Sequence, residues 1–117
     1  MAWKSYRDMI AWQKAMDLTD DIYRLVALLP KEERYGLADQ MRRAAVSVPS
    51  NIAEGQGRLT SKEFRQFLGI ARASIYELET QLLIGVRQAF FSETQVEPSL
   101  SLCDEIGKML TKQITSY

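Results

Sequence analysis

The chain has 117 residues, enough for one hydrophobic core and too few for two folded domains, so we expect a single domain over residues 1–117. Its 15 lysines and arginines balance 15 acidic residues, which excludes the strongly basic composition of a dedicated nucleic-acid binder. Without histidine and with Cys103 as its one cysteine, it cannot form a disulfide framework, a Cys/His metal site or a histidine-dependent triad. No apolar stretch approaches the ~20 residues of a membrane span, so we expect a soluble, cytoplasmic protein with no membrane partner and no cofactor.

The first predicted helix runs roughly from Tyr6 to Leu29. Hydrophobic residues recur there at alternating steps of four and three, which is the period of one helix face. Pro30 ends the helix, because a proline disfavours helical geometry in the residue before it. The face expected to point inward consists of Ala11, Ala15, Leu18, Ile22, Leu25 and Leu29.

A second helix is predicted to begin near Glu33 to Tyr35 and to contain Pro49, where we expect a kink rather than a boundary. It closes at Gly55-Gln56-Gly57, because glycine takes the left-handed C-terminal conformation at little cost. Its inward face consists of Leu37, Met41, Ala44, Val48 and Ile52.

A third helix is predicted to start after Thr60. This residue stands three positions before Glu63, which is the capping-box spacing, and Leu59 and Phe64 occupy the positions of a hydrophobic staple. The inward face runs through about seven turns. It consists of Phe64, Leu68, Ala71, Ile75, Leu78, Leu82 and Val86.

The fourth helix follows the same pattern, with Ser92 and Gln95 as the capping pair and Phe91 and Val96 as the staple. Pro98 is expected to kink or delay this helix. Four amphipathic helices with short joints and no strand alternation predict an all-α, antiparallel up-down-up-down four-helix bundle. The inward face of the fourth helix consists of Leu102, Ile106, Met109, Leu110, Ile114 and Tyr117.

The second helix carries a further apolar face, roughly opposite its inward one. A helix that is apolar on two sides is expected to be buried on both, so this face predicts a subunit interface in a homo-oligomer. The alternative is a partly exposed surface of small residues, which monomeric proteins also show. The face consists of Ala45, Val46, Pro49 and Ala53.

Polar residues form a row between these two faces. If the second and third helices form an antiparallel hairpin, facing residues have numbers that sum to about 121. Ser47 then faces Ser74, and Arg58 faces Glu63.

This row has two interpretations. It could be a functional pocket with Glu54 and Glu77 as its carboxylates, or a hydrogen-bonded seam that fixes the helix register. We favour the seam, because no phosphate loop, nucleophile motif or metal-ligand spacing accompanies the two carboxylates. The seam residues are Ser47, Asn51, Glu54, Arg58, Ser74 and Glu77.

Residues 42–58, which read RRAAVSVPSNIAEGQGR, closely resemble a known family. This family consists of bacterial four-helix bundle proteins related to those encoded by intervening sequences in large-subunit ribosomal RNA genes. The VPSNIAEG string is highly specific, and the match extends over essentially the whole chain, through Lys62-Glu63-Phe64, Phe67-Leu68, Ser74 and Glu77-Leu78. Ala73 departs from the pattern, because the family usually has glycine there.

The resemblance implies an antiparallel bundle that assembles as a ring-like homopentamer, usually without an assigned enzymatic activity. The accessory protein of diversity-generating retroelements is similar in architecture, and it binds nucleic acid together with a reverse transcriptase. That relative is strongly basic, whereas this chain is neutral.

The charge of this chain is nevertheless uneven. Between residues 34 and 72, seven basic residues stand against three acidic ones, whereas residues 77 to 117 hold three basic and six acidic residues. In a symmetric oligomer a modest basic patch is repeated and can hold phosphate backbone; the alternative is a solvated helix surface. Arg42 and Arg43 lie about 100° apart on their helix, so only one of them can join Lys62, Arg65 and Arg72 at a nucleic-acid-facing edge.

Three classes of function follow. The leading one is a non-enzymatic, oligomeric module that binds RNA or DNA through phosphate contacts, or associates with a nucleic-acid enzyme. A purely protein–protein assembly scaffold or accessory subunit without nucleic-acid binding is the alternative. An enzyme comes last, because no catalytic constellation is present.

Overall fold

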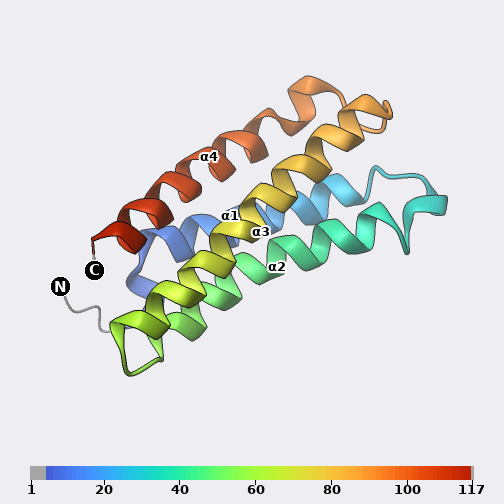
Figure 1. Ribbon diagram of the computed structural model, residues 1–117. Coiled ribbons are helices and arrows are strands. Elements are labelled where there is room, and N and C mark those ends of the chain that lie inside the picture. The colour runs from blue at the N-terminus through green and yellow to red at the C-terminus, as the bar shows by residue number, and fades with distance from the viewer. Residues whose placement is uncertain (1–4, 117) are drawn as a thin grey trace.

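The computed structural model describes residues 5–116, and all regular structure within that range is helical. Figure 1 shows four long helices: α1 (Ile10–Val26), α2 (Leu37–Gln56), α3 (Ser61–Arg87) and α4 (Glu93–Thr115). Two short 3-10 helices, η1 (Tyr6–Asp8) and η2 (Lys31–Glu33), precede α1 and α2. The predicted all-α fold with four helices is confirmed.

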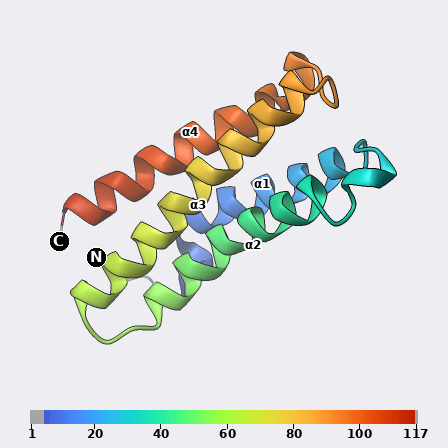
Figure 2. The same cartoon turned by 45° about the vertical axis from the view of Figure 1, so that its right-hand side comes forward.

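The helices run alternately up and down and pack as the corners of a square. Each helix contacts two neighbours, α1 with α2 and α4, and α3 with α2 and α4, whereas α1 and α3 lie diagonally opposite. Figure 2 shows the α1–α2 pair on one side of the bundle and the α3–α4 pair on the other. The outer side of the α1–α2 pair therefore faces away from the outer side of the α3–α4 pair.

The predicted inward faces form one hydrophobic core. The expected residues of α2 are all buried, as are those of α1 and α3 except for Leu29 and Val86, which are half-buried. In α4, Ile106 and Leu110 are fully buried and three other expected residues are half-buried, while Tyr117 lies outside the described residues. The half-buried three are Leu102, Met109 and Ile114.

The first helix is shorter than predicted, because the chain breaks at both ends of the expected range. Met9 has extended backbone (φ −73°, ψ 124°) and separates η1 from α1 while burying its own side chain in the core. After Val26 the chain turns toward Pro30, and Leu29 donates its N–H to the Val26 carbonyl. The prediction of one helix from Tyr6 to Leu29 is therefore wrong at its two termini.

The second helix begins at Leu37, later than predicted, because η2 and Gly36 precede it. Its first N–H groups are partly satisfied by the Glu33 carboxylate, which accepts from the Leu37 N–H at 3.2 Å. The helix continues through Pro49 without a boundary, as predicted.

The α2–α3 turn differs from its prediction in two ways. Gly57 is not left-handed but stays in the right-handed region (φ −80°, ψ −3°), where its N–H bonds the Ala53 and Glu54 carbonyls. Thr60 caps α3 by accepting from the Glu63 N–H at 3.2 Å, but Leu59 is 99% exposed, so the staple does not form.

The α3–α4 turn contains a complete capping box, in which Ser92 accepts from the Gln95 N–H and the Gln95 side chain accepts from the Ser92 N–H. Phe91 and Val96, the predicted staple, are both buried. The helix begins at Glu93, so Pro98 does not delay it.

The end of α3 adopts a motif that was not predicted. Ala89 is left-handed with φ 63°, and Phe90 donates its N–H to the Gly85 carbonyl at 2.9 Å while Ala89 donates to the Val86 carbonyl at 3.0 Å. These two bonds form a Schellman motif, which normally places glycine at the left-handed position. Within residues 5–116, none of the helices is long and apolar enough to cross a bilayer.

Candidate functional site

The polar row between α2 and α3 is a hydrogen-bonded seam. The Ser47 and Ser74 hydroxyls lie 2.8 Å apart, which confirms the predicted register of the hairpin. Asn51 donates from Nδ2 to the Ser47 carbonyl at 2.8 Å and to the Ser47 Oγ at 2.9 Å. The Asn51 amide therefore holds the Ser47 hydroxyl in place opposite Ser74.

Arg58 and Glu63, which were expected to face each other, form no ion pair. Arg58 pairs instead with Glu54 of its own helix at 3.2 Å, and its guanidinium lies 4.5 Å from the centre of the Phe67 ring. Glu63 lies near its own helix start, where its carboxylate accepts from the Thr60 hydroxyl at 3.1 Å. Each charged group therefore has its partners close to its own end of the turn.

The two candidate carboxylates do not converge on a pocket. Glu54 and Glu77 are both exposed; Glu54 pairs with Arg58, and Glu77 accepts from the Gln81 amide at 3.3 Å. The described residues also contain no group of three or more His, Cys, Asp or Glu side chains that could hold a metal ion. This geometry favours the seam interpretation.

The structure places part of the predicted basic set at the α3–α4 side of the bundle. Arg72 donates from Nη1 to the Thr111 hydroxyl of α4 at 3.2 Å. Arg65 lies two turns before Arg72 on the same side of α3, and the exposed Lys62 is about 60° further round. None of these three cations has a carboxylate of residues 5–116 within ion-pair distance.

Arg42 and Arg43 lie elsewhere, so the structure does not bring either of them to the edge formed by Arg65 and Arg72. Both line a depression that also includes Tyr23 of α1, and Arg43 pairs with Asp39 at 3.2 Å. The α1–α2 side of the bundle faces away from the α3–α4 side.

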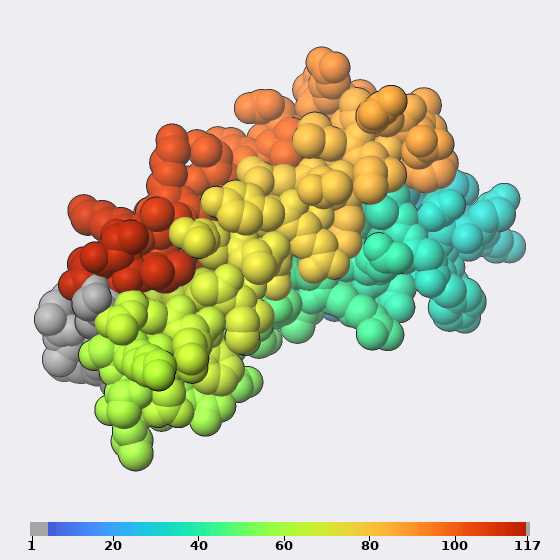
Figure 3. Space-filling view, in the orientation of Figure 1, coloured from blue at the N-terminus to red at the C-terminus, as the bar shows by residue number. Residues whose placement is uncertain are grey.

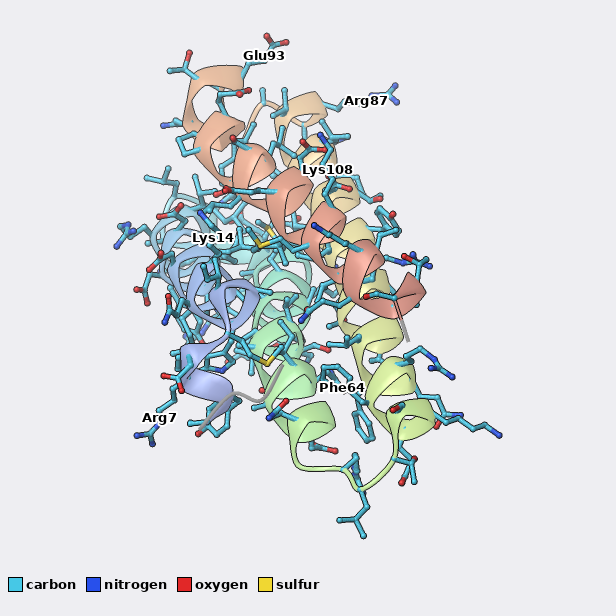
Figure 4. All side chains as sticks on the ribbon, turned by 90° about the vertical axis from the view of Figure 1, so that its left-hand side faces the viewer. Arg7, Lys14, Phe64, Arg87, Glu93 and Lys108 are labelled. Atoms are coloured by element: carbon cyan, nitrogen blue, oxygen red, sulfur yellow. The ribbon has the colours of Figure 1, made fainter. Side chains whose placement is uncertain are left out.

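Two basic residues of α4, rather than Arg42 or Arg43, lie on the α3–α4 side of the bundle. Lys108 and Lys112 of α4 line a depression of about 320 Å³ between α3 and α4, together with Thr111 and the half-exposed Tyr76. Figure 4 shows Lys108 on the outer side of α4, and Figure 3 shows the face on which α3 and α4 lie side by side. We call Lys62, Arg65, Arg72, Lys108 and Lys112 the α3–α4 basic edge.

Sequence reasoning missed the two lysines because it summed charge over residues 77–117, where acidic residues dominate. A finer signal was present, since residues 106–116 contain Lys108 and Lys112 and no acidic residue.

The far end of the same depression is acidic. Burial raises the pKa of Glu79, and the nearby Asp104 carboxylate raises it further. Burial also raises the pKa of the Cys103 thiol to about 12, with a smaller contribution from Glu79. Asp104 pairs with Lys108 at 3.1 Å, so this end is partly neutralised. Lys112, which also lines the depression, has no carboxylate of residues 5–116 within ion-pair distance.

Of the four residues in the predicted subunit interface, two are buried within the bundle and two are accessible. Ala45 has no exposed surface, because α1 packs on it and Thr19 donates to its carbonyl at 3.3 Å, so Ala45 cannot contribute to a subunit contact. Pro49 is buried as well, whereas Val46 is 42% exposed and Ala53 is half-buried.

The open part of this face lies in a groove that sequence reasoning did not find. Residues of α1 form its other wall, and two adjoining depressions of about 340 and 480 Å³ share Val46 and Ser50. The α1–α2 groove is lined chiefly by Trp12, Met16, Tyr23, Val46, Pro49 and Ala53.

Comparison with known proteins gives one family. The model of the family described as 23S rRNA-intervening sequence protein matches residues 7–112. Among solved structures, the chain is similar to the crystal structure of a protein of unknown function from the S23 ribosomal protein family of Bacteroides thetaiotaomicron, with a TM-score of 0.83 and 24% sequence identity. That match covers 90% of this chain and 98% of the other, and it shows a shared fold. No curated protein sequence matches the chain.

Proposed function

Because the chain belongs to the 23S rRNA-intervening sequence protein family, we propose that it is a non-enzymatic, self-assembling module that binds the phosphate backbone of RNA or DNA. The observation that carries the proposal is the α3–α4 basic edge. Four of its five cations have no carboxylate of residues 5–116 within ion-pair distance. Their charge is therefore free to replace the counterions of a phosphate backbone.

The shape of the edge supports a sequence-tolerant mode of binding. Arg65 and Arg72 are half-buried and are spaced two turns apart, about 10 Å, along the side of α3 that faces α4. Tyr76 is 55% exposed beside the depression and offers one aromatic ring on which an unpaired base can stack. Binding through phosphates with a single stacking ring favours single strands over duplexes and carries little base specificity.

Self-assembly makes this local charge effective in a neutral chain. A ring of subunits, five by family resemblance, repeats the basic edge around its circumference and multiplies the phosphate contacts. Affinity for a long strand then exceeds the affinity of one subunit by avidity.

The test measures binding of a fluorescein-labelled, 30-nucleotide single-stranded RNA by anisotropy at several salt concentrations. The variant is Arg65→Glu/Lys112→Glu, which leaves the Arg72–Thr111 contact in place. We expect at least a tenfold loss of affinity at low salt and a salt dependence that is shallower by about one unit of slope per lost phosphate contact.

The matched control is Lys31→Glu/Arg34→Glu, which makes the same change of charge at the opposite end of the bundle. This control should lose much less affinity than the edge variant. Equal losses in both variants would show that only net charge matters, and no binding by the unmodified protein would leave the protein-scaffold function, which the α1–α2 groove favours.

A further inference from the structure

Some of the exposed large hydrophobic side chains lie on two separate surfaces of the bundle. In the α1–α2 groove, Met16, Tyr23 and Val46 keep 42%, 49% and 42% of their surface exposed. On the outer side of α3, Ile70 and Ile84 keep 49% and 43% exposed. Because α1 packs on α2 and α4 but not on α3, the two surfaces do not overlap. Exposed hydrophobic side chains on these two surfaces are available for contact with another molecule.

The two surfaces have opposite shapes. The groove is a concave strip whose floor includes Pro49 and whose wall includes Trp12. The surface on α3 is convex, because Ile70, Glu77 and Ile84 follow one another at intervals of seven residues and therefore project on the same side of the helix. We call these three residues the α3 ridge.

The two surfaces also carry opposite charges, Arg42 and Glu77, that form no ion pair within residues 5–116. No carboxylate of residues 5–116 lies within ion-pair distance of Arg42, at one end of the groove. Glu77, at the centre of the ridge, accepts from Gln81 but has no cation of the described chain within the same distance.

The spacing of these features matches. Arg42 lies seven residues from Pro49 in the groove, and Glu77 lies seven residues from Ile70 and from Ile84 on the ridge. Both intervals correspond to two helical turns, about 10 Å. A helix lying along the groove can therefore place an isoleucine over Pro49 and Glu77 beside Arg42 at the same time.

We infer that the α1–α2 groove of one copy of this chain takes the α3 ridge of a second copy, with Glu77 of the ridge paired to Arg42 of the groove. This inference rests on the self-assembly included in the proposed function, and it defines the contact as heterologous. Each added copy leaves one groove and one ridge free, so the contact propagates and closes into a ring when the rotation permits.

The first experiment separates a heterologous contact from a self-complementary one. Val46→Asp blocks the groove and leaves the ridge intact, whereas Ile70→Asp blocks the ridge and leaves the groove intact. Both residues are exposed, so the bundle should fold, which circular dichroism checks. By sedimentation, the unmodified protein should be oligomeric and each variant monomeric, while their equimolar mixture should form a 1:1 dimer and nothing larger.

The second experiment tests the charge pair. Glu77→Arg and Arg42→Glu should each weaken assembly at least tenfold, and the double variant should recover most of that loss; Glu97→Arg, on the exposed side of α4, is the control. A monomeric unmodified protein, a mixture that stays monomeric, or a double variant no better than the singles would overturn the inference. Assembly is measured without RNA, so its failure is distinct from failure of nucleic-acid binding.

Discussion

The C-terminal ends of α2 and α3 differ in whether a residue adopts the left-handed conformation, and the difference is opposite to what the residue types predict. At the end of α2 a glycine, Gly57, is available for the left-handed conformation and does not use it. At the end of α3 the left-handed position is taken by Ala89, which has a β-carbon that disfavours it. The comparison shows that residue type alone does not decide which helix end turns left-handed.

Burial explains the difference. The turn after α3 places Phe91 in the core with 3% of its surface exposed, and full burial of such a side chain is worth about 1.5–3 kcal/mol. That gain exceeds the cost of a left-handed alanine, about 1–2 kcal/mol. After α2 the corresponding residue, Leu59, is 99% exposed, so no burial depends on the shape of that turn.

The largest expected effect comes from Gly85→Ala, which tests whether Phe91 controls the α3–α4 turn. A β-carbon at residue 85 would overlap the ring of Phe91, which is buried in the core. We expect the free energy of unfolding to fall by about 2 kcal/mol in urea denaturation. Gly69→Ala is the matched control on the same helix; its β-carbon meets no atom within 4 Å, so stability should rise by up to about 1 kcal/mol. Equal effects of the two substitutions would remove the role given to Phe91.

The caps of the two turns should differ by a smaller amount. Ser92→Ala breaks a complete capping box, whereas Thr60→Ala removes a cap without the reciprocal backbone bond. We expect losses of about 1–2 kcal/mol for Ser92→Ala and about 0.5–1 kcal/mol for Thr60→Ala, measured by thermal and urea unfolding. A larger loss of stability in Thr60→Ala than in Ser92→Ala would contradict the prediction that the cap of α4 contributes more than the cap of α3.

Ala89→Gly should stabilise the protein. Glycine relieves the left-handed strain but has more freedom to lose on folding, so the net gain is expected to be about 0.5–1 kcal/mol. Calorimetry at a single pH measures this gain, and Ala73→Gly, at an exposed position within α3, serves as a control that should lose about 1 kcal/mol. A destabilised Ala89→Gly variant would mean that the alanine is not strained.

The smallest effect is expected for Gly57→Ala. Since Gly57 has right-handed geometry and the nearest atom to an added β-carbon is the Glu54 carbonyl oxygen at 3.5 Å, alanine fits without strain. Stability should rise by about 0.5 kcal/mol through the unfolded chain. A clear loss in urea denaturation would show that the turn needs glycine after all.

The sequence predicted the helix faces well because hydrophobic period reports directly on burial. It also predicted the Ser47–Ser74 contact, since the short turn between α2 and α3 fixes the register of the hairpin. It did not predict the neighbours of each helix beyond that hairpin. A helical wheel shows the direction in which a side chain points from its own helix. It does not show which helix lies in that direction, because that depends on how all four helices pack.

This explains the outcome at the candidate site. Arg42 and Arg72 belong to adjacent helices, but one lies toward α1 and the other toward α4. For the same reason the wheel identified Val46 without its neighbour Met16 on α1, and Arg72 without its partner Thr111 on α4.

The buried thiol of Cys103 allows the opening rate of the α3–α4 contact to be measured. It is the single cysteine of the chain, it is fully buried, and burial raises its pKa to about 12, so the reactive thiolate is scarce in the folded state. A thiol reagent can react only when α4 separates from its neighbours, and the labelling rate then counts those openings. The rate of Cys103 labelling, followed by mass spectrometry, therefore measures how often this part of the protein unfolds locally, and no added probe is needed.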